Sequence, residues 1–157
     1  MIAPDVALTA AHCMGGTWDV QIGSDDKDGG ESISVRRTVN HPKYNSGTDV
    51  YDIALVFLDR PTNMDIKYVR INADNNFPPV SSLATTMGWG DMDEGDGVDL
   101  PDILREVDLG VISNSECEDA KNGDDSYSGW IFDSMLCTKE KDKDACQGDS
   151  GKIPVCN

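Results

Sequence analysis

The chain has 157 residues, 38% of them hydrophobic, and a formal net charge of −16. This length suits one domain or two small halves packed together, and the composition argues against wholesale disorder. The absence of a G-x-y or heptad period excludes collagen and coiled coils. A pI near 4.2 with scattered basic residues argues against nucleic acid and anionic membranes, which attract clustered Lys and Arg. The longest purely apolar run, 53–58, is far shorter than the roughly 20 residues that span a bilayer.

Alternation of apolar and polar residues predicts half-buried strands at 18–22, 33–39 and 103–111. The run 53–58 is apolar throughout and is bounded by Asp52 and by Asp59-Arg60-Pro61, which predicts a strand covered on both faces. One short helix is predicted at 114–120, where Ser113 and Glu116 have the spacing of a capping box.

Residues typical of turns separate these segments at 24–30, 41–47, 72–79, 91–97 and 122–129. Many short strands at this spacing indicate an all-β sandwich or barrel. The segment 72–79 is the best candidate for a linker, so we expect two halves, residues 1–77 and 78–157.

The N-terminal residues lack both the basic and the long apolar regions of a signal peptide, which indicates either a cytosolic protein or a natural N-terminus further upstream. Five cysteines are an odd number, which indicates a missing partner, a reactive thiol, or ordinary reduced thiols. There is no Cys-x-x-Cys pair and there are only two His residues, so we predict no structural zinc site.

Three short segments could carry chemistry together: 8–13 (LTAAHC), 52–55 (DIAL) and 144–151 (DACQGDSG). Nucleophilic catalysis needs a hydroxyl, an imidazole that takes its proton, and a carboxylate that orients the imidazole. Ser150, His12 and Asp52 supply one member each, in a chain order that is known for this geometry. Each segment alone is weak evidence, because such residues are common in loops and at strand ends.

With these segments and with 40–45 (NHPKYN), 87–90 (MGWG) and 135–137 (MLC), the chain resembles the trypsin-like (chymotrypsin-family, S1) serine proteases along its whole length. The resemblance implies an all-β fold of two antiparallel Greek-key barrels with the site between them. The half 1–77 would carry His12 and Asp52, and the half 78–157 would carry Ser150. Together they would form one peptidase domain.

The resemblance also implies roles for single residues. Ser150 would be the acyl nucleophile, His12 the general base, and Asp52 the carboxylate that fixes the tautomer of His12. The backbone N–H groups of Gly148 and Ser150 would form the oxyanion hole. Asp144, six positions before Ser150, would lie at the base of the substrate pocket and select Arg or Lys before the cut.

Two residues compete for these roles. His41, before Pro42, matches a structural position of the family, and Asp49 does not directly precede the apolar run, so we expect His12 and Asp52 to act. Asp144 has an alternative reading as one more acid in the charged stretch 139–144.

Both ends depart from the family pattern. We expect the N-terminal and C-terminal strands of the complete fold to be missing, and with them the α-amino terminus that would pair with Asp149. Lys152 stands where the family usually has Gly. By resemblance Cys117 and Cys137 would form a disulfide, whereas the partners of Cys13 and Cys146 would lie outside the chain. Cys156 has no assigned partner.

The acidic loops 24–31 and 91–96 invite a calcium hypothesis, but neither has the terminal Glu of an EF-hand loop, so we expect solvated loops and no metal or other cofactor. The family further implies secretion, protein or peptide substrates, protein inhibitors and a monomer without nucleic-acid or membrane partners. The alternative function is a non-catalytic homologue, or an inactive fragment, that acts by binding proteins.

Overall fold

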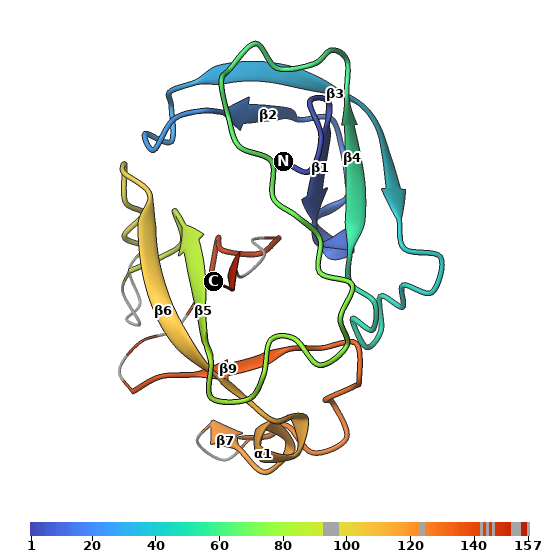
Figure 1. The fold of residues 1–157 in the computed structure, drawn as a ribbon, viewed down its shortest axis with the longest axis vertical. Helices are drawn as coiled ribbons and strands as arrows, with labels where there is room; N and C mark the ends of the chain where they lie inside the picture. The colour runs from blue at the N-terminus through green and yellow to red at the C-terminus, as the bar shows by residue number, and fades with distance from the viewer. Residues whose placement is uncertain are drawn as a thin grey trace.

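The computed structural model describes residues 1–92, 98–122, 125–141, 143, 145, 147–151 and 155–156. Nearly all of its regular structure is strand (Figure 1). In chain order, the elements are β1 (Val6–Thr9), η1 (Ala11–Cys13), β2 (Asp19–Ile22), β3 (Glu31–Asn40), β4 (Ala54–Leu58), β5 (Leu83–Gly88), β6 (Arg105–Ile112), α1 (Asn114–Glu118), β7 (Lys121–Asn122), β8 (Asp125–Ser126), β9 (Cys137–Lys139) and β10 (Val155–Cys156).

The first sheet has the antiparallel order β1-β4-β3-β2, which curls through the upper part of the molecule (Figure 1). The predicted strands at 18–22 and 33–39 are confirmed as β2 and β3. A register shift between Val35 and Arg37 bends β3 across β4. One face of the sheet buries a cluster formed by Ile22, Ile33, Val56 and Leu58.

The predicted strand at 53–58 is confirmed as β4, but only one of its faces is fully covered. Ala54, Val56 and Leu58 are buried, whereas Leu55 and Phe57 are half-buried. The guanidinium carbon of Arg37 lies 3.7 Å from the centre of the Phe57 ring. On the outer face a cationic side chain therefore packs on Phe57, where we had expected apolar packing.

The second sheet has the order β10-β5-β6-β9, and a separate hairpin joins β7 to β8. The strand predicted at 103–111 is confirmed as β6, which pairs with β5 from Leu83 opposite Gly110 onward. Alternation of apolar and polar residues did not predict the strands β1 and β5. In β1 no residue is fully buried, so its two faces do not differ in burial. In β5 the buried residues are Ala84 and Thr86, which are too small or too polar to give an apolar signal.

The helix predicted at 114–120 is confirmed as the shorter α1, and the Ser113 hydroxyl accepts a hydrogen bond from the Glu116 N–H at 3.1 Å. Just after it, the hairpin of β7 and β8 extends into the segment predicted as a turn at 122–129. The two sheets, with very little helix, agree with the expected two-barrel, trypsin-like all-β fold. No helix in the described part of the chain is long and apolar enough to cross a membrane.

The loop at 24–30 joins the two halves, although we had predicted only a solvated turn. The Leu104 N–H donates to the Asp25 carbonyl at 2.7 Å, and the Lys27 N–H donates to the Asp102 carbonyl at 2.9 Å. The Lys27 ammonium also lies 3.0 Å from the Asp102 carboxylate. Most side chains of the loop remain exposed, but its backbone is paired with the segment that leads into β6.

Candidate active site

His12 and Asp52 are brought together by the pairing of β1 with β4. These strands are antiparallel and Thr9 lies opposite Ala54, so the end of β1 meets the start of β4. His12 follows β1 in η1, and Asp52 precedes β4. Residues 40 positions apart in the sequence therefore lie in contact.

Both oxygens of the Asp52 carboxylate are used on His12. The Nδ1 atom of His12 lies 2.6 Å from Oδ2, and the His12 backbone N–H donates to Oδ1 at 2.8 Å. The His12 side chain is 41% exposed and that of Asp52 is 20% exposed. A neutral ring that donates its Nδ1–H to the carboxylate leaves Nε2 as a proton acceptor.

Ser150 lies exposed in the turn 147–151, next to a glycine that packs against Thr9 and Cys13. Gly151 has a φ of +84°, and a Cβ there would collide with the hydroxyl of Thr9 and lie 3.4 Å from the Cys13 sulfur. Only glycine permits this approach. Within the described residues Ser150 makes no hydrogen bond to His12. The structure therefore pairs two of the three predicted residues and places the neighbour of the third, Gly151, against Thr9 and Cys13.

The same turn is tied to the end of β5 through the motif at 87–90. The Gly90 N–H donates to the Asp149 carboxylate at 2.9 Å, and the Asp91 N–H donates to the Gln147 carbonyl at 2.8 Å. A Cβ on Gly90 would collide with that carboxylate. In the sequence analysis this motif appears only among the segments that resemble the family, with no role assigned to it. In the structure it anchors the turn that carries Ser150.

Gly148, predicted for the oxyanion hole, has a φ of +90°. A Cβ there would lie 3.3 Å from the Cα atom of Gly90, so glycine serves both the conformation and the close approach of two backbone segments. Asp144, the predicted residue of the substrate pocket, and Cys146 lie outside the described residues.

Three cysteines are described with their side chains. Cys117 of α1 and Cys137 of β9 form a disulfide, with their Cα atoms 6.2 Å apart. Cys13 is a free, half-buried thiol whose sulfur lies 3.5 Å from Nε2 of His12. Burial, and secondarily the charge of Asp52, raises the pKa of the Cys13 thiol, so it stays protonated near neutral pH.

The two competing residues have partners other than His12. His41 accepts a hydrogen bond at Nδ1 from the Lys43 N–H at 3.2 Å, and its ring stacks on that of Tyr51. Asp49 accepts a hydrogen bond from the Tyr44 hydroxyl at 3.3 Å.

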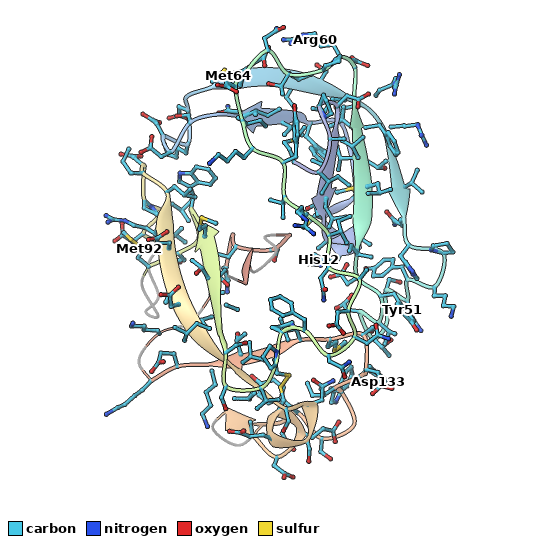
Figure 2. The ribbon with its side chains drawn as sticks, in the orientation of Figure 1. His12, Tyr51, Arg60, Met64, Met92 and Asp133 are labelled. Carbon is cyan, nitrogen blue, oxygen red and sulfur yellow. A yellow bond between two sulfur atoms is a disulfide. The ribbon has the colours of Figure 1, made fainter. Side chains whose placement is uncertain are left out.

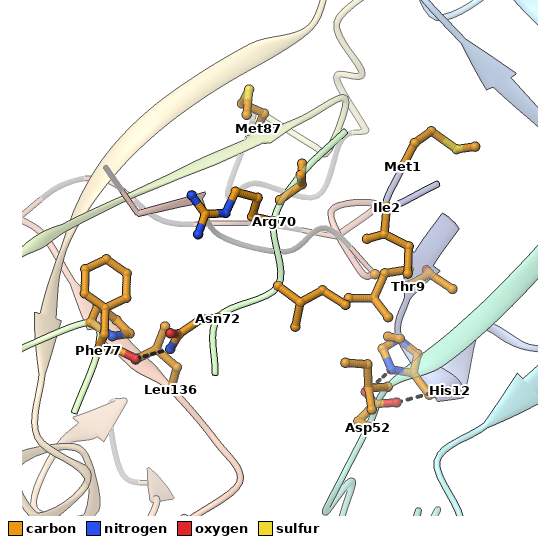
Figure 3. A pocket seen from close by; sticks show the side chains of 17 residues that line it. Met1, Ile2, Thr9, His12, Asp52, Arg70, Asn72, Phe77, Met87 and Leu136 are labelled. Atoms are coloured by element: carbon orange, nitrogen blue, oxygen red, sulfur yellow. Dashed lines mark hydrogen bonds and ion pairs between the residues drawn. The ribbon is translucent and has the colours of Figure 1, made fainter. Parts of the chain in front are cut away.

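A cavity of about 820 Å³ opens beside the pair (Figure 3). His12 and Asp52 line one side, and side chains of the segment 69–78 and of the second half line the other. Most of this lining is apolar, with Arg70 as its exposed cation. The remaining lining residues are Met1, Ile2, Leu8, Thr9, Ala10, Ile53, Val69, Ile71, Asn72, Phe77, Pro78, Met87, Leu136 and Gly151.

In the described part of the chain, no group of three or more His, Cys, Asp or Glu residues is arranged to hold a metal ion. In the loop at 24–30, oxygens that we had weighed as calcium ligands close local turns instead. Asp26 Oδ1 accepts a hydrogen bond from the Asp28 N–H at 2.9 Å, and Ser24 Oγ accepts one from the Asp26 N–H at 3.0 Å. Most of the second acidic loop, residues 93–97, lies outside the described residues.

Comparison with known proteins extends the resemblance to the whole sequence. A profile of the trypsin family matches residues 1–157. Trypsin epsilon of Drosophila erecta is 40% identical over 154 residues, which cover 94% of this chain and 58% of that protein. Trypsin of Sarcophaga bullata is 37% identical over 164 residues, covering 100% and 63%, and serine protease 1 of Rattus norvegicus is 34% identical over 156 residues, covering 96% and 61%. The chain thus spans less than two thirds of the length of these relatives. The chain belongs to the trypsin family.

Proposed function

We propose that the protein is a serine endopeptidase that cleaves peptide bonds through an acyl-enzyme. Ser150 Oγ attacks the scissile carbonyl carbon and transfers its proton to Nε2 of His12. His12 then protonates the leaving amine as the C–N bond breaks. Water then attacks the acyl ester on Ser150 with the same help from His12, which releases the carboxylic acid product and restores the Ser150 hydroxyl. Asp52 holds the ring so that Nε2 faces the reaction and stabilises the imidazolium that forms.

The observation that carries this proposal is the double contact of Asp52 with His12. A carboxylate that binds both Nδ1 and the backbone N–H of one histidine fixes the ring orientation and the tautomer that a general base requires. The packing of Gly151 against Thr9 and Cys13 adds support, because it draws the chain at Ser150 toward the imidazole. Contacts between a nucleophile and its base are often long before substrate binds.

The oxyanion hole in this proposal consists of the backbone N–H groups of Gly148 and Ser150. The positive φ of Gly148 and the anchoring of Asp149 by Gly90 support a rigid turn at this place. A rigid turn is what electrostatic stabilisation requires, because donors that are already oriented need no reorganisation during the reaction.

We further propose that the division near residue 77 separates the two barrels of one peptidase domain, with His12 and Asp52 on the first and Ser150 on the second. The disulfide supports an extracellular location, because such bonds persist in oxidising compartments. Substrates and inhibitors would be proteins or peptides, and the enzyme would act as a monomer.

The nucleophile is tested by labelling the folded chain with a serine-directed phosphonate probe. Labelling should disappear in Ser150→Ala and persist in Ser46→Ala, an exposed serine of another turn. Circular dichroism should show the same fold in all three proteins. Equal labelling of Ser150→Ala and the parent would refute the nucleophile. A folded parent that takes up no probe would favour the non-catalytic homologue.

The preference for Arg or Lys before the cut rests on the position of Asp144 in the family motif. Asp144→Ser should lower kcat/KM for peptides with Arg or Lys at that position relative to peptides with an apolar residue there, because the pocket loses the carboxylate that pairs with the cation. The matched control is Asp133→Ser, a substitution of the same type at an exposed carboxylate that the proposal leaves without a role. An unchanged preference in Asp144→Ser would refute this assignment.

A further inference from the structure

Tyr51, the residue directly before Asp52, has an unusual backbone conformation. Its φ is 56°, in the left-handed region that residues other than glycine rarely enter. An aromatic side chain gains nothing there from local hydrogen bonding, as Asn or Asp would. Such a conformation persists only where surrounding contacts impose it, and these conformations gather at functional sites.

The ring of Tyr51 is held by its neighbours rather than through its hydroxyl. It stacks on the ring of His41 with the centroids 4.7 Å apart and the planes 14° apart. The Lys43 ammonium lies 5.5 Å from the centre of the Tyr51 ring on the same loop. Within the described residues the hydroxyl has no hydrogen-bond partner, so a phenyl ring would provide the same contacts.

The backbone around Tyr51 is also fixed on both sides of Asp52. The Tyr51 N–H donates to the hydroxyl of Ser134, a residue of the second half, at 3.3 Å. The Ile53 N–H donates to the Tyr51 carbonyl at 2.8 Å, and the His41 N–H donates to the Ile53 carbonyl at 2.9 Å. Figure 2 shows Tyr51 on the same side of the molecule as His12, with Asp133 of the second half below it.

We propose that Tyr51, through its stack with His41, is a positioning residue that holds the Asp52 carboxylate on His12. Asp52 lies between Tyr51, a member of the stack, and Ile53, whose backbone is hydrogen-bonded to Tyr51 and His41, so its Cα–Cβ direction depends on the left-handed turn at Tyr51. If Tyr51 relaxed to negative φ, that direction would change, and the contacts of Asp52 with Nδ1 and with the His12 N–H would be lost. The effect of Tyr51 on catalysis rests on the proposed function, whereas its effect on the contacts between Asp52 and His12 does not.

Proton NMR of the full chain tests the geometry without any need for turnover. The Nδ1–H of His12, in its short hydrogen bond to Asp52, should resonate far downfield of the backbone amides, and the signal is assigned by its absence in His12→Gln. Tyr51→Phe and His41→Phe keep a ring in the stack and should keep this resonance. Tyr51→Ala and His41→Ala should lose it. Tyr127→Ala, at an exposed tyrosine far along the chain, should leave it unchanged.

Two outcomes would overturn the proposal: a downfield resonance that persists in both folded Ala variants, or one that is lost equally in the Phe and Ala variants. If Tyr51→Ala fails to fold by circular dichroism, His41→Ala removes the same stack while leaving residue 51 intact, and decides the question.

Kinetics on a small ester substrate separate this proposal from the proposed function. Tyr51→Ala should lower kcat about tenfold with KM nearly unchanged, because misplacement of the base affects the chemical step and not binding. A parent that has no activity but shows the downfield resonance, lost in the Ala variants, would contradict the proposed function and leave the positioning role intact. An active parent with unchanged kcat in Tyr51→Ala would contradict the positioning role alone.

Discussion

The two halves of the molecule are stabilised by different means. The first sheet buries a continuous cluster of large aliphatic side chains, and Leu58 and Val56 in it are 0% and 1% exposed. The second sheet buries the aliphatic residues Leu109 and Val111 together with the small residue Ala84 and the polar residue Thr86, and a disulfide joins its edge strand to α1. The comparison indicates that both sheets bury apolar side chains, and that in the described residues the covalent cross-link lies in the half that carries Ser150.

The first half also has a polar network that links the start of β3 to the segment after β4. Arg60 Nη1 and the side-chain amide Nδ2 of Asn63 donate to Oε1 of Glu31 at 2.5 and 3.0 Å. The Thr62 hydroxyl and the Asn63 N–H donate to Oε2 at 2.6 and 2.9 Å. These bonds, led by that from Thr62, lower the pKa of Glu31 to about 2.

The largest effect is expected from Leu58→Ala. Removal of a fully buried Leu side chain should lower the free energy of unfolding by about 2–5 kcal/mol, because the cluster loses its contacts and keeps a cavity. Urea denaturation measures the loss. The increase in hydrogen exchange relative to the parent should be larger in β2, β3 and β4 than in β5 and β6.

Leu83→Ala is the control for this change, because it is the same truncation at a side chain that is 58% exposed in β5. It should change the free energy of unfolding by less than about 0.5 kcal/mol. Equal losses from the two substitutions would contradict the importance of the first cluster.

The next effect in size is expected from replacing Cys117 and Cys137 together by Ser. The bond closes a loop between residues 20 positions apart, and its loss should lower the free energy of unfolding by about 3 kcal/mol, mainly through the greater freedom of the unfolded chain. Hydrogen exchange should increase chiefly in α1, β6 and β9. Cys13→Ser, which removes a free thiol from the first half, is the matched control and should leave exchange in these elements unchanged. Faster exchange confined to the first sheet would contradict the assignment.

The smallest effect is expected from Glu31→Gln, and it depends on pH. A carboxylate whose pKa is lower in the folded than in the unfolded protein stabilises the fold above its unfolded pKa, and this contribution disappears as the pH falls toward the folded pKa. The parent should therefore be more stable than Glu31→Gln at pH 6, and the difference should shrink between about pH 4.5 and pH 2. Thermal denaturation at several pH values measures it.

Glu106→Gln is the control for the pH experiment, because Glu106 is an exposed glutamate of β6 in the second half. It should show no comparable dependence on pH. A constant difference between the parent and Glu31→Gln from pH 6 to pH 2 would show that Glu31 acts through its shape and not through its charge.

Several local features could be predicted because their signal lies in neighbouring residues. Alternation located β2, β3 and β6, since a strand with one buried face must place apolar side chains at every second position. The spacing of Ser113 and Glu116 located the start of α1, since the hydroxyl needs an N–H three residues on. The strand β5 could not be found in this way, because Ala84 and Thr86 are buried without being large and apolar.

The sequence by itself determined the residue types of the candidate site and their order, His12, Asp52 and Ser150, through the motifs around them. Only the tertiary structure decided which atoms meet: the double contact of Asp52 with His12, the anchoring of Asp149 by Gly90, and the stack of Tyr51 on His41. The physical reason is that periodicity and capping act over a few residues, whereas contacts across 40 or 59 positions depend on strand pairing and on how closely glycines let backbone segments approach.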